Sequence, residues 1–261
     1  MIRRLMKYDV KKMLGFIPYI YAITLLLAVI TRIVNIGKDI QVFSIIGSVF
    51  SSLVYSAIAS VLINTFITIL AVFIKSFYKD ESYLTHTLPV KKEQQLISKY
   101  LSALIVVLLS VSVCVASLLI MLYSDTFFST VKALLAATVA GFNISGGLFI
   151  TIIVLIVFFQ ICTLMSMAFT AVVKANTYNT KRVSKGVMWF IAYYFGAMMT
   201  ALLLMAVALA IGGNISDFLA EQMSQGGFMT IMLVGMGAYA AFSVAFYFLC
   251  NHMFKKGVNV D

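Results

Sequence analysis

Two long stretches without a charged side chain constrain this sequence more than any other feature. Residues 42–74 and 133–173 contain no Asp, Glu, Lys or Arg, and most of their side chains are apolar. A helix of about 20 apolar residues is long enough to cross the roughly 30 Å hydrocarbon core of a bilayer. Only 11% of all residues are charged and the mean hydropathy is +1.05, whereas about a quarter of the residues of a soluble domain are charged. We therefore expect an integral membrane protein.

The apolar stretches favour helices over the strands of a membrane barrel. Barrel strands are about ten residues long and alternate between apolar and polar side chains, and that alternation does not organise this chain. We predict an all-α polytopic protein in which residues 1–261 form a single transmembrane domain. Its six transmembrane helices are expected at about residues 16–34, 54–74, 101–123, 150–172, 187–211 and 229–250.

The stretch 42–74 is longer than one span requires. As a single helix it would be about 50 Å long at 1.5 Å per residue. We expect its first part to lie in the outer leaflet or in an external vestibule, or the helix to break at Gly47. In each case the second span proper is 54–74.

The basic residues predict the orientation in the membrane. Of the nineteen Lys and Arg residues, sixteen lie before the first span, between the second and third, between the fourth and fifth, or after the sixth. Positive residues concentrate in cytoplasmic segments, so we place both termini and the interval 75–99 in the cytoplasm. Residues 1–15 are expected to form a basic helix on the membrane surface. Because the basic groups flank the spans, the net charge of +10 indicates contact with anionic lipid and not with nucleic acid.

Motifs for catalysis are absent from the sequence. It has no GxxxxGK[ST] phosphate loop, no HExxH and no GxSxG. His86 and His252 lie in separate segments, and Cys114, Cys162 and Cys250 lie in three different spans, so neither set predicts a metal site. No Asp, Glu, Lys, Arg or His lies in the middle of a predicted span, where ion-coupled transporters and intramembrane hydrolases usually keep an ionisable group. We expect a chain without catalytic residues, metal or cofactor. If it moves a substrate, the energy comes from another chain.

The interval 75–99 is the longest polar segment. It carries five basic and three acidic residues, and a mixed patch of aromatic, apolar and hydroxyl side chains lies among them at residues 83–89. A loop that only reverses the direction of the chain needs fewer residues. Apolar groups set among charges indicate a surface that docks onto another protein. The alternative is a solvated loop whose apolar residues rest on the membrane surface.

The residues of this loop resemble those of a known family. The stretch from Phe77 to Val90, followed by Ser98 and Lys99, looks like the cytoplasmic loop of six-span ABC exporter permeases of the ABC-type 2 class. Some of these Gram-positive permeases export amphipathic peptides or confer immunity to antimicrobial peptides. The family loop typically reads acid-Glu-Gly-Tyr-Leu-Thr-x-Thr-Leu-Pro, and here Ser82 stands in place of the glycine. The matching residues are Glu81, Tyr83, Leu84, Thr85, Thr87, Leu88 and Pro89.

The resemblance implies a partner for the loop. The loop would form a coupling helix in a groove of a separate cytoplasmic ATPase subunit, which would hold ATP and Mg²⁺ and perform the hydrolysis. Tyr83, Leu84 and Leu88 would be apolar anchors, while Asp80 and Glu81 would meet basic groups of the partner. The remaining residues of the implied coupling set are Thr85, His86 and Pro89.

The resemblance also implies an assembly and a cargo. The permease would work as a homodimer or heterodimer in the plasma membrane of a bacterium, and it would export an amphipathic peptide or a similar hydrophobic cargo. Two other functions remain open. One is an immunity or sensor protein that binds a peptide without moving it, and the other is an intramembrane enzyme.

Polar side chains recur every four residues in the second predicted span. The series ends with Ser56, Ser60, Asn64 and Thr68, which share one face of a helix. Two interpretations remain: a translocation path, or close packing of helices through small residues, which is the commoner use of this spacing in membranes. Asn64 is the strongest path candidate because a buried amide needs a polar partner or water. Gln160 in the fourth span is a second candidate.

The fifth predicted span carries two pairs of large, adaptable side chains. Tyr193, Tyr194, Met198 and Met199 would offer a soft apolar surface to an amphipathic cargo. Ordinary packing in a helix bundle is the commoner reason for such residues. The sequence leaves both interpretations open.

Overall fold

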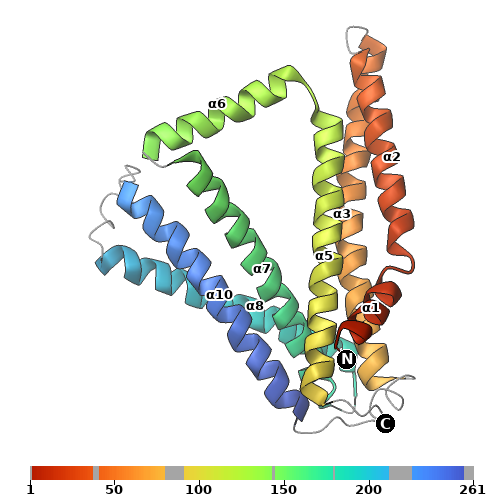
Figure 1. Cartoon of the computed structure of the whole chain (residues 1–261), viewed down its shortest axis with the longest axis vertical. Coiled ribbons are helices and arrows are strands. Elements are labelled where there is room, and N and C mark those ends of the chain that lie inside the picture. Colours follow the sequence, from red (N-terminus) through yellow and green to blue (C-terminus); the bar gives the residue numbers. More distant parts are fainter. Residues whose placement is uncertain are drawn as a thin grey trace. The chain divides into compact units, whose positions relative to one another are not determined.

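The structure is a computed structural model that describes residues 2–37, 41–79, 91–142, 145–178, 180–211 and 225–255. All regular secondary structure in these ranges is α-helical (Figure 1). This confirms the prediction of an all-α chain. The helices described are α1 (Ile2–Met13), α2 (Ile17–Ile36), α3 (Gln41–Tyr78), α5 (Lys92–Leu122), α6 (Asp125–Phe142), α7 (Gly146–Ala175), α8 (Arg182–Ile211) and α10 (Gln225–Lys255).

Six of the described helices are long and apolar enough to cross a membrane, as predicted: α2, α3, α5, α7, α8 and α10. Several begin or end outside the predicted spans. The clearest case is α5, which begins at Lys92 and not near residue 101. Lys, Glu and Gln are good helix formers, and Glu93 lies in the first turn, where the helix dipole favours an acid. The charged end of the interval 75–99 is therefore helical.

The stretch 42–74 lies within one unbroken helix. α3 has 38 residues, which corresponds to about 57 Å at 1.5 Å per residue, so the expected break at Gly47 is wrong. Gly47 serves a contact between helices. A Cβ at this position would lie 2.5 Å from Oδ1 of Asn35 in α2. The glycine lets α2 and α3 approach each other closely, and one Gly costs a helix only about 1 kcal/mol.

The chain divides into two compact units, Met1–Thr130 and Val131–Asp261. In the first unit α2, α3 and α5 pack against one another, and α1 packs on α5 and α3 (Figure 1). Ala28, Val54 and Met121 form a buried cluster where the three long helices meet. Large apolar side chains also cover the outside of the unit, among them Leu26 and Ile63, which are 60% and 58% exposed. An apolar exterior over an apolar core is what a lipid environment requires.

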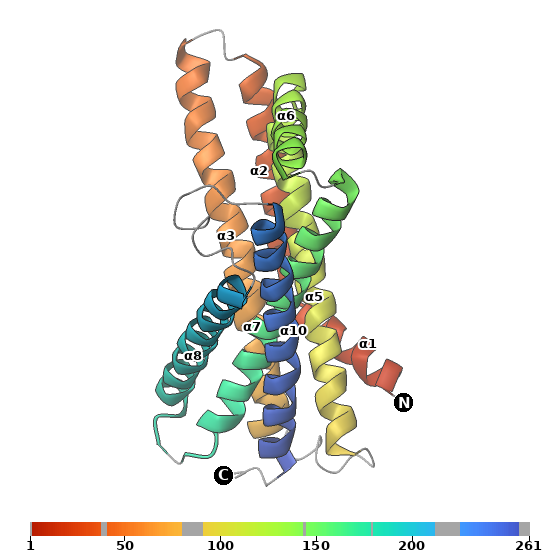
Figure 2. The same ribbon diagram turned by 90° about the vertical axis from the view of Figure 1, so that its left-hand side faces the viewer.

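The second unit contains α7, α8 and α10. Figure 2 shows α10 running along α7 with α8 at an angle, and α8 contacts both of the other helices. The C-terminal half of α7 is almost entirely buried, from Cys162 to Ala175. Small side chains such as Ala168 and Ala171 in this half allow a neighbouring backbone to approach. α6, which the sequence did not predict as a separate helix, connects the two units along the chain.

Candidate functional site

The proposed coupling residues lie outside the described residues. These are Asp80, Glu81, Tyr83, Leu84, Thr85, His86, Leu88 and Pro89. The structure does describe the two helices on either side of them. α3 ends at Tyr78, α5 begins at Lys92, and the two helices pack against each other. The segment between them therefore connects two packed helices that are each long and apolar enough to span a membrane.

A buried ion pair lies at this end of the hairpin. The Nζ of Lys99 in α5 contacts Oδ1 of Asp9 in α1 and donates a hydrogen bond to Oγ of Ser76 in α3 at 2.9 Å. The hydroxyl of Ser98 donates to the other carboxylate oxygen of Asp9 at 3.2 Å. Asp9 and Lys99 are only 5% and 7% exposed. We call Asp9, Ser76, Ser98 and Lys99 the polar anchor, since together they connect α1, α3 and α5.

The polar anchor explains why α1 packs where it does. Two charges withdrawn from water are tolerated when each has a counter-charge and further hydrogen bonds, and both conditions are met here. Sequence reasoning counted Lys99 among the basic residues of a loop and missed this role. The available signal was Asp9, which is the only acid in a helix that carries five basic residues. An acid in such a helix is a candidate for pairing with a neighbouring element.

The predicted polar face of the second span makes its Asn64 hydrogen bonds within its own helix. Ser56 is exposed, and Ser60, Asn64 and Thr68 are half-buried. The amide of Asn64 donates to the carbonyl of Ser60 at 2.8 Å and to its hydroxyl at 3.0 Å, both on its own helix. The amide therefore finds its partners locally, and whether this face lines a path stays a prediction.

A second buried polar contact of α3 is made one residue after Asn64, at Thr65. Its hydroxyl donates to the carbonyl of Val61 at 2.7 Å and lies 2.8 Å from Oγ of Ser110 in α5. Ser110 Oγ is also 2.6 Å from the hydroxyl of Tyr21 in α2. Thr65 and Ser110 are 2% and 0% exposed. A chain of three hydroxyls thus connects the three long helices of the first unit.

A pocket with a basic residue also lies in the first unit, with a volume of about 620 Å³. Arg32 and Asn35 of α2 line it together with residues of α3 and α5 and of the start of α6. The guanidinium of Arg32 lies 5.3 Å from the ring centre of Tyr123, within the range of a cation–π contact. An arginine beside an aromatic ring near the end of a span is typical of the membrane interface.

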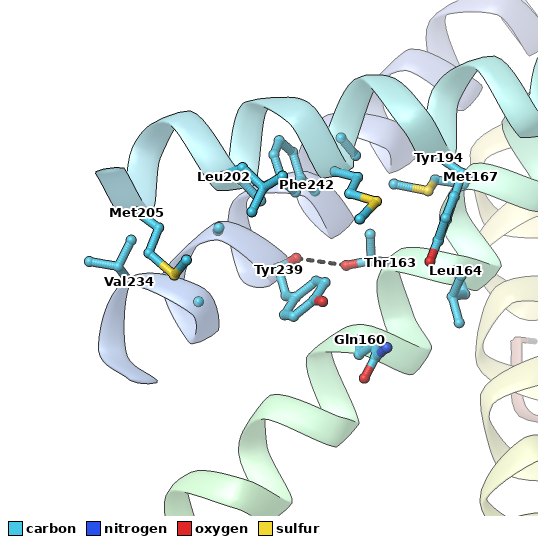
Figure 3. A pocket seen from close by; sticks show the side chains of 15 residues that line it. Gln160, Thr163, Leu164, Met167, Tyr194, Leu202, Met205, Val234, Tyr239 and Phe242 are labelled. Atoms are coloured by element: carbon cyan, nitrogen blue, oxygen red, sulfur yellow. Dashed lines mark hydrogen bonds between the residues drawn. The ribbon is translucent and has the colours of Figure 1, made fainter. Parts of the chain in front are cut away.

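The second unit contains a mostly apolar pocket of about 310 Å³ between α7, α8 and α10 (Figure 3). Gln160, the second path candidate, is one of its lining residues, and so are Tyr194 and Met198 from the predicted soft surface of the fifth span. Tyr193 and Met199 do not line it. Residues of three helices that are distant in the sequence therefore meet at this pocket, which no motif indicated.

One hydroxyl of the pocket is occupied by helix packing. Thr163 Oγ1 donates to the carbonyls of Phe159 and of Tyr239, in each case at 2.8 Å. The second bond ties α7 to α10, and Figure 3 shows it at the centre of the pocket. The amide of Gln160 and the side-chain hydroxyls of Tyr194 and Tyr239 take part in no hydrogen bond within the described part of the chain. These three groups are available to a ligand.

The described residues contain no group of three His, Cys, Asp or Glu side chains that could hold a metal ion. Cys114, Cys162 and Cys250 are buried, and none of the three forms a disulfide bond. The helices and their hydropathy define the chain as an all-α, multi-span membrane protein. Comparison of the chain with models of known protein families, with curated proteins and with solved structures finds no match.

Proposed function

We propose that this chain is the membrane-spanning permease subunit of an ABC exporter. The observation that carries the proposal is the residue pattern between α3 and α5. Glu81, Tyr83, Leu84, Leu88 and Pro89 match the coupling loop of the six-span permeases, and they occur between two packed helices that are each long enough to span a membrane. A docking segment at the end of a rigid hairpin is well suited to transmit a partner's movement to membrane helices.

The polar anchor supports this interpretation. It holds α1 against α5 and α3 through a buried ion pair and hydrogen bonds, close to where the loop begins and ends. A push on the loop would therefore move α1 together with the ends of α3 and α5. An assembly that moves as one body loses little of an applied displacement to internal rearrangement.

In this mechanism the energy comes from the partner chain. ATP and Mg²⁺ would bind to the cytoplasmic ATPase subunits, whose closure would move the loops of two permease copies. The helix bundles would then alternate between inward and outward access in the bacterial plasma membrane. The cargo would be an amphipathic peptide or a similar hydrophobic molecule, and the residues of this chain would bind it and change its access without reacting with it.

The test is purification of the chain with its native partners, followed by a change in the loop. The double variant Glu81→Lys with Leu84→Asp reverses one charge and places a carboxylate at an apolar anchor. Loss of a central interface anchor commonly costs about 2 kcal/mol, roughly a thirtyfold loss of affinity. The variant should insert normally, release the ATP-hydrolysing subunit and lose cargo-stimulated hydrolysis.

A matched control is Val258→Asp with Asp261→Lys, which makes the same kinds of change at the C-terminal end. That end lies on the same side of the membrane under the predicted orientation, and the control should keep the ATPase. A chain that purifies in active form without any ATPase would contradict transport. Retention of the ATPase by the loop variant together with loss of cargo binding would make the loop a substrate site.

A further inference from the structure

The pocket between α7, α8 and α10 exists because small residues of α8 and of α10 line it. Ala197 and Ala201 of α8 and Gly235 and Ala238 of α10 all line it. A Cβ added to Gly235 would meet no atom within 4 Å. Larger side chains at these positions would fill the space, so the volume of about 310 Å³ follows directly from their small size.

The pocket extends along α8. Its lining residues on α8 extend from Tyr194 to Met205, three helical turns or about 16 Å at 1.5 Å per residue. A pocket of this length suits a ligand that lies along α8 with its two ends in different surroundings.

The polar groups lie toward one end of this pocket. Figure 3 shows Met205 and Val234 at one end, Leu202 and then Tyr239 further along, and Tyr194 at the other end with Leu164 and Met167. The two phenol hydroxyls and the amide of Gln160 are the polar groups without a hydrogen bond in the described residues. A pocket with one apolar end and several free donors and acceptors near the other favours a ligand that is itself amphipathic.

The lining residues favour a ligand with an uncharged head group. No Asp, Glu, Lys, Arg or His is among the lining residues, and an ion placed among apolar side chains without a counter-charge is strongly disfavoured. Amide and phenol groups donate and accept hydrogen bonds, which suits a hydroxyl, ester or amide.

Tyr194, Met198 and Leu202 are about half exposed, so the pocket is open along α8 and a chain can enter from the side.

We propose that this pocket binds a neutral amphiphile, with its hydrocarbon part against Leu202, Met205 and Val234 and its uncharged head group near Gln160, Tyr194 and Tyr239. A neutral lipid and an acyl chain attached to a cargo molecule share this chemistry. Binding itself does not depend on the proposed function. Only the identification of the ligand as exported cargo rests on that function.

The test uses photoreactive probes on the purified chain in nanodiscs, without an ATPase. Three probes carry the same diazirine-labelled hydrocarbon chain and differ in the head group: a monoacylglycerol, a fatty acid anion and an alkyl trimethylammonium. The monoacylglycerol should label peptides from α7, α8 and α10, and it should do so about tenfold more strongly than either charged probe. An unlabelled monoacylglycerol and an uncharged N-acylated peptide, used as competitors, distinguish the two sources of the ligand.

Two glycines of α10 provide a matched pair of variants. Gly235→Leu should place its side chain in the pocket and reduce labelling about tenfold. Gly237→Leu makes the same change two residues further on, where a Cβ also meets no atom within 4 Å, but Gly237 does not line the pocket. Leucine is a better helix former than glycine at both positions, so a difference between the two variants reports the pocket and not the stability of the helix.

A second set of variants tests the recognition of the head group. Gln160→Leu with Tyr194→Phe and Tyr239→Phe keeps the shape of the pocket and removes its free polar groups. The triple variant should still bind the hydrocarbon chain but lose the preference for the neutral probe.

Two results would overturn the proposal. One is equal labelling by all three probes in the unmodified chain, which would mean that no head group is recognised. The other is labelling that Gly235→Leu leaves unchanged, which would mean that the probe only partitions into the surrounding lipid. Loss of the ATPase from the loop variant changes neither measurement, so this proposal and the proposed function fail separately.

Discussion

The most buried polar contacts between helices differ in kind between the two units, although Ser102 of α5 in the first unit also donates to a backbone carbonyl, that of Met6 in α1. In the first unit, charged and hydroxyl side chains of one helix contact side chains of another, at Asp9 with Lys99 and at Thr65 with Ser110. In the second unit, Thr163 and Thr170 of α7 donate to backbone carbonyls of α10, at Tyr239 and Phe246. Contacts of the first kind require two particular side chains, whereas contacts of the second kind require only one.

This difference determines what each unit can tolerate. A pair of side chains fixes the register between two helices, because a shift along either axis separates the partners. A hydroxyl that donates to a carbonyl depends mainly on close approach of the backbones, which small residues permit. In the second unit, small residues of α8 and α10 also leave room for the apolar pocket beside Thr163. The first unit has an interior connected by hydroxyl groups and an anchor made of charges.

The largest loss of stability is expected when the ion pair of the polar anchor is broken. Lys99→Met leaves the carboxylate of Asp9 buried without its counter-charge, and breaking a buried pair in this way typically costs about 3–5 kcal/mol. Unfolding by a denaturing detergent should show the loss, and trypsin should cleave faster within α1. The double variant Lys99→Met with Asp9→Asn should recover most of the stability, because neither group is then charged.

Lys11→Met is the control for this prediction. It removes the same charge from the same end of the first unit, but Lys11 is exposed and its loss should change the free energy of unfolding by less than about 0.5 kcal/mol. Equal stability of the Lys99→Met and Lys11→Met variants would show that the anchor contributes nothing.

An intermediate loss of stability is expected when single hydrogen bonds between helices are removed, and this compares the two kinds of contact directly. A double-mutant cycle on Thr65→Val and Ser110→Ala should give a coupling energy of about 0.6 kcal/mol, the average for interhelical hydrogen bonds in a membrane. Thr170→Val alone should cost less stability than Thr65→Val alone. The carbonyl of Phe246, which accepts from Thr170, lies within α10 and keeps its backbone hydrogen bond when the hydroxyl is removed. A larger loss at Thr170 than at Thr65 would reverse the comparison between the units.

The smallest effect on stability is expected at Asn64. Both hydrogen bonds of its amide are made to Ser60 on the same helix, so Asn64→Leu should shift the free energy of unfolding by less than about 0.5 kcal/mol. A transport assay then tests the path interpretation, with Ser44→Ala as the control. Impaired transport in a stable Asn64→Leu protein supports a path, and unchanged transport contradicts it. Loss of the folded protein would support helix packing.

The spans were predictable because hydropathy is a local property. An uncharged stretch such as 133–173 has to be placed in an apolar environment whatever it packs against. Helix ends were less predictable, since Lys92 and Glu93 belong to a helix although they are too polar to belong to the apolar part of a span. The break expected at Gly47 was wrong for a related reason. A glycine does not stop a helix in lipid, and here it makes room for Asn35.

Site residues were less predictable than spans, because their roles depend on partners far along the chain. The four-residue spacing placed Asn64 on a face, but it is Thr65, one position on, that contacts Ser110. The spacing identifies residues that share a face and does not say which face meets another helix. Gln160 was selected for its polarity alone, and the structure adds Tyr194 and Tyr239 beside it.

The sequence by itself determined that this chain is helical, that it has six segments able to cross a membrane, and that its longest polar segment lies between the second and third of them. These properties follow from side-chain transfer energies summed over neighbouring residues. The tertiary structure alone decided that Asp9 meets Lys99 and that Gly235 and Ala201 leave a pocket near Tyr239. Such contacts join residues tens of positions apart, and they depend on how the helices pack, which no local property of the chain specifies.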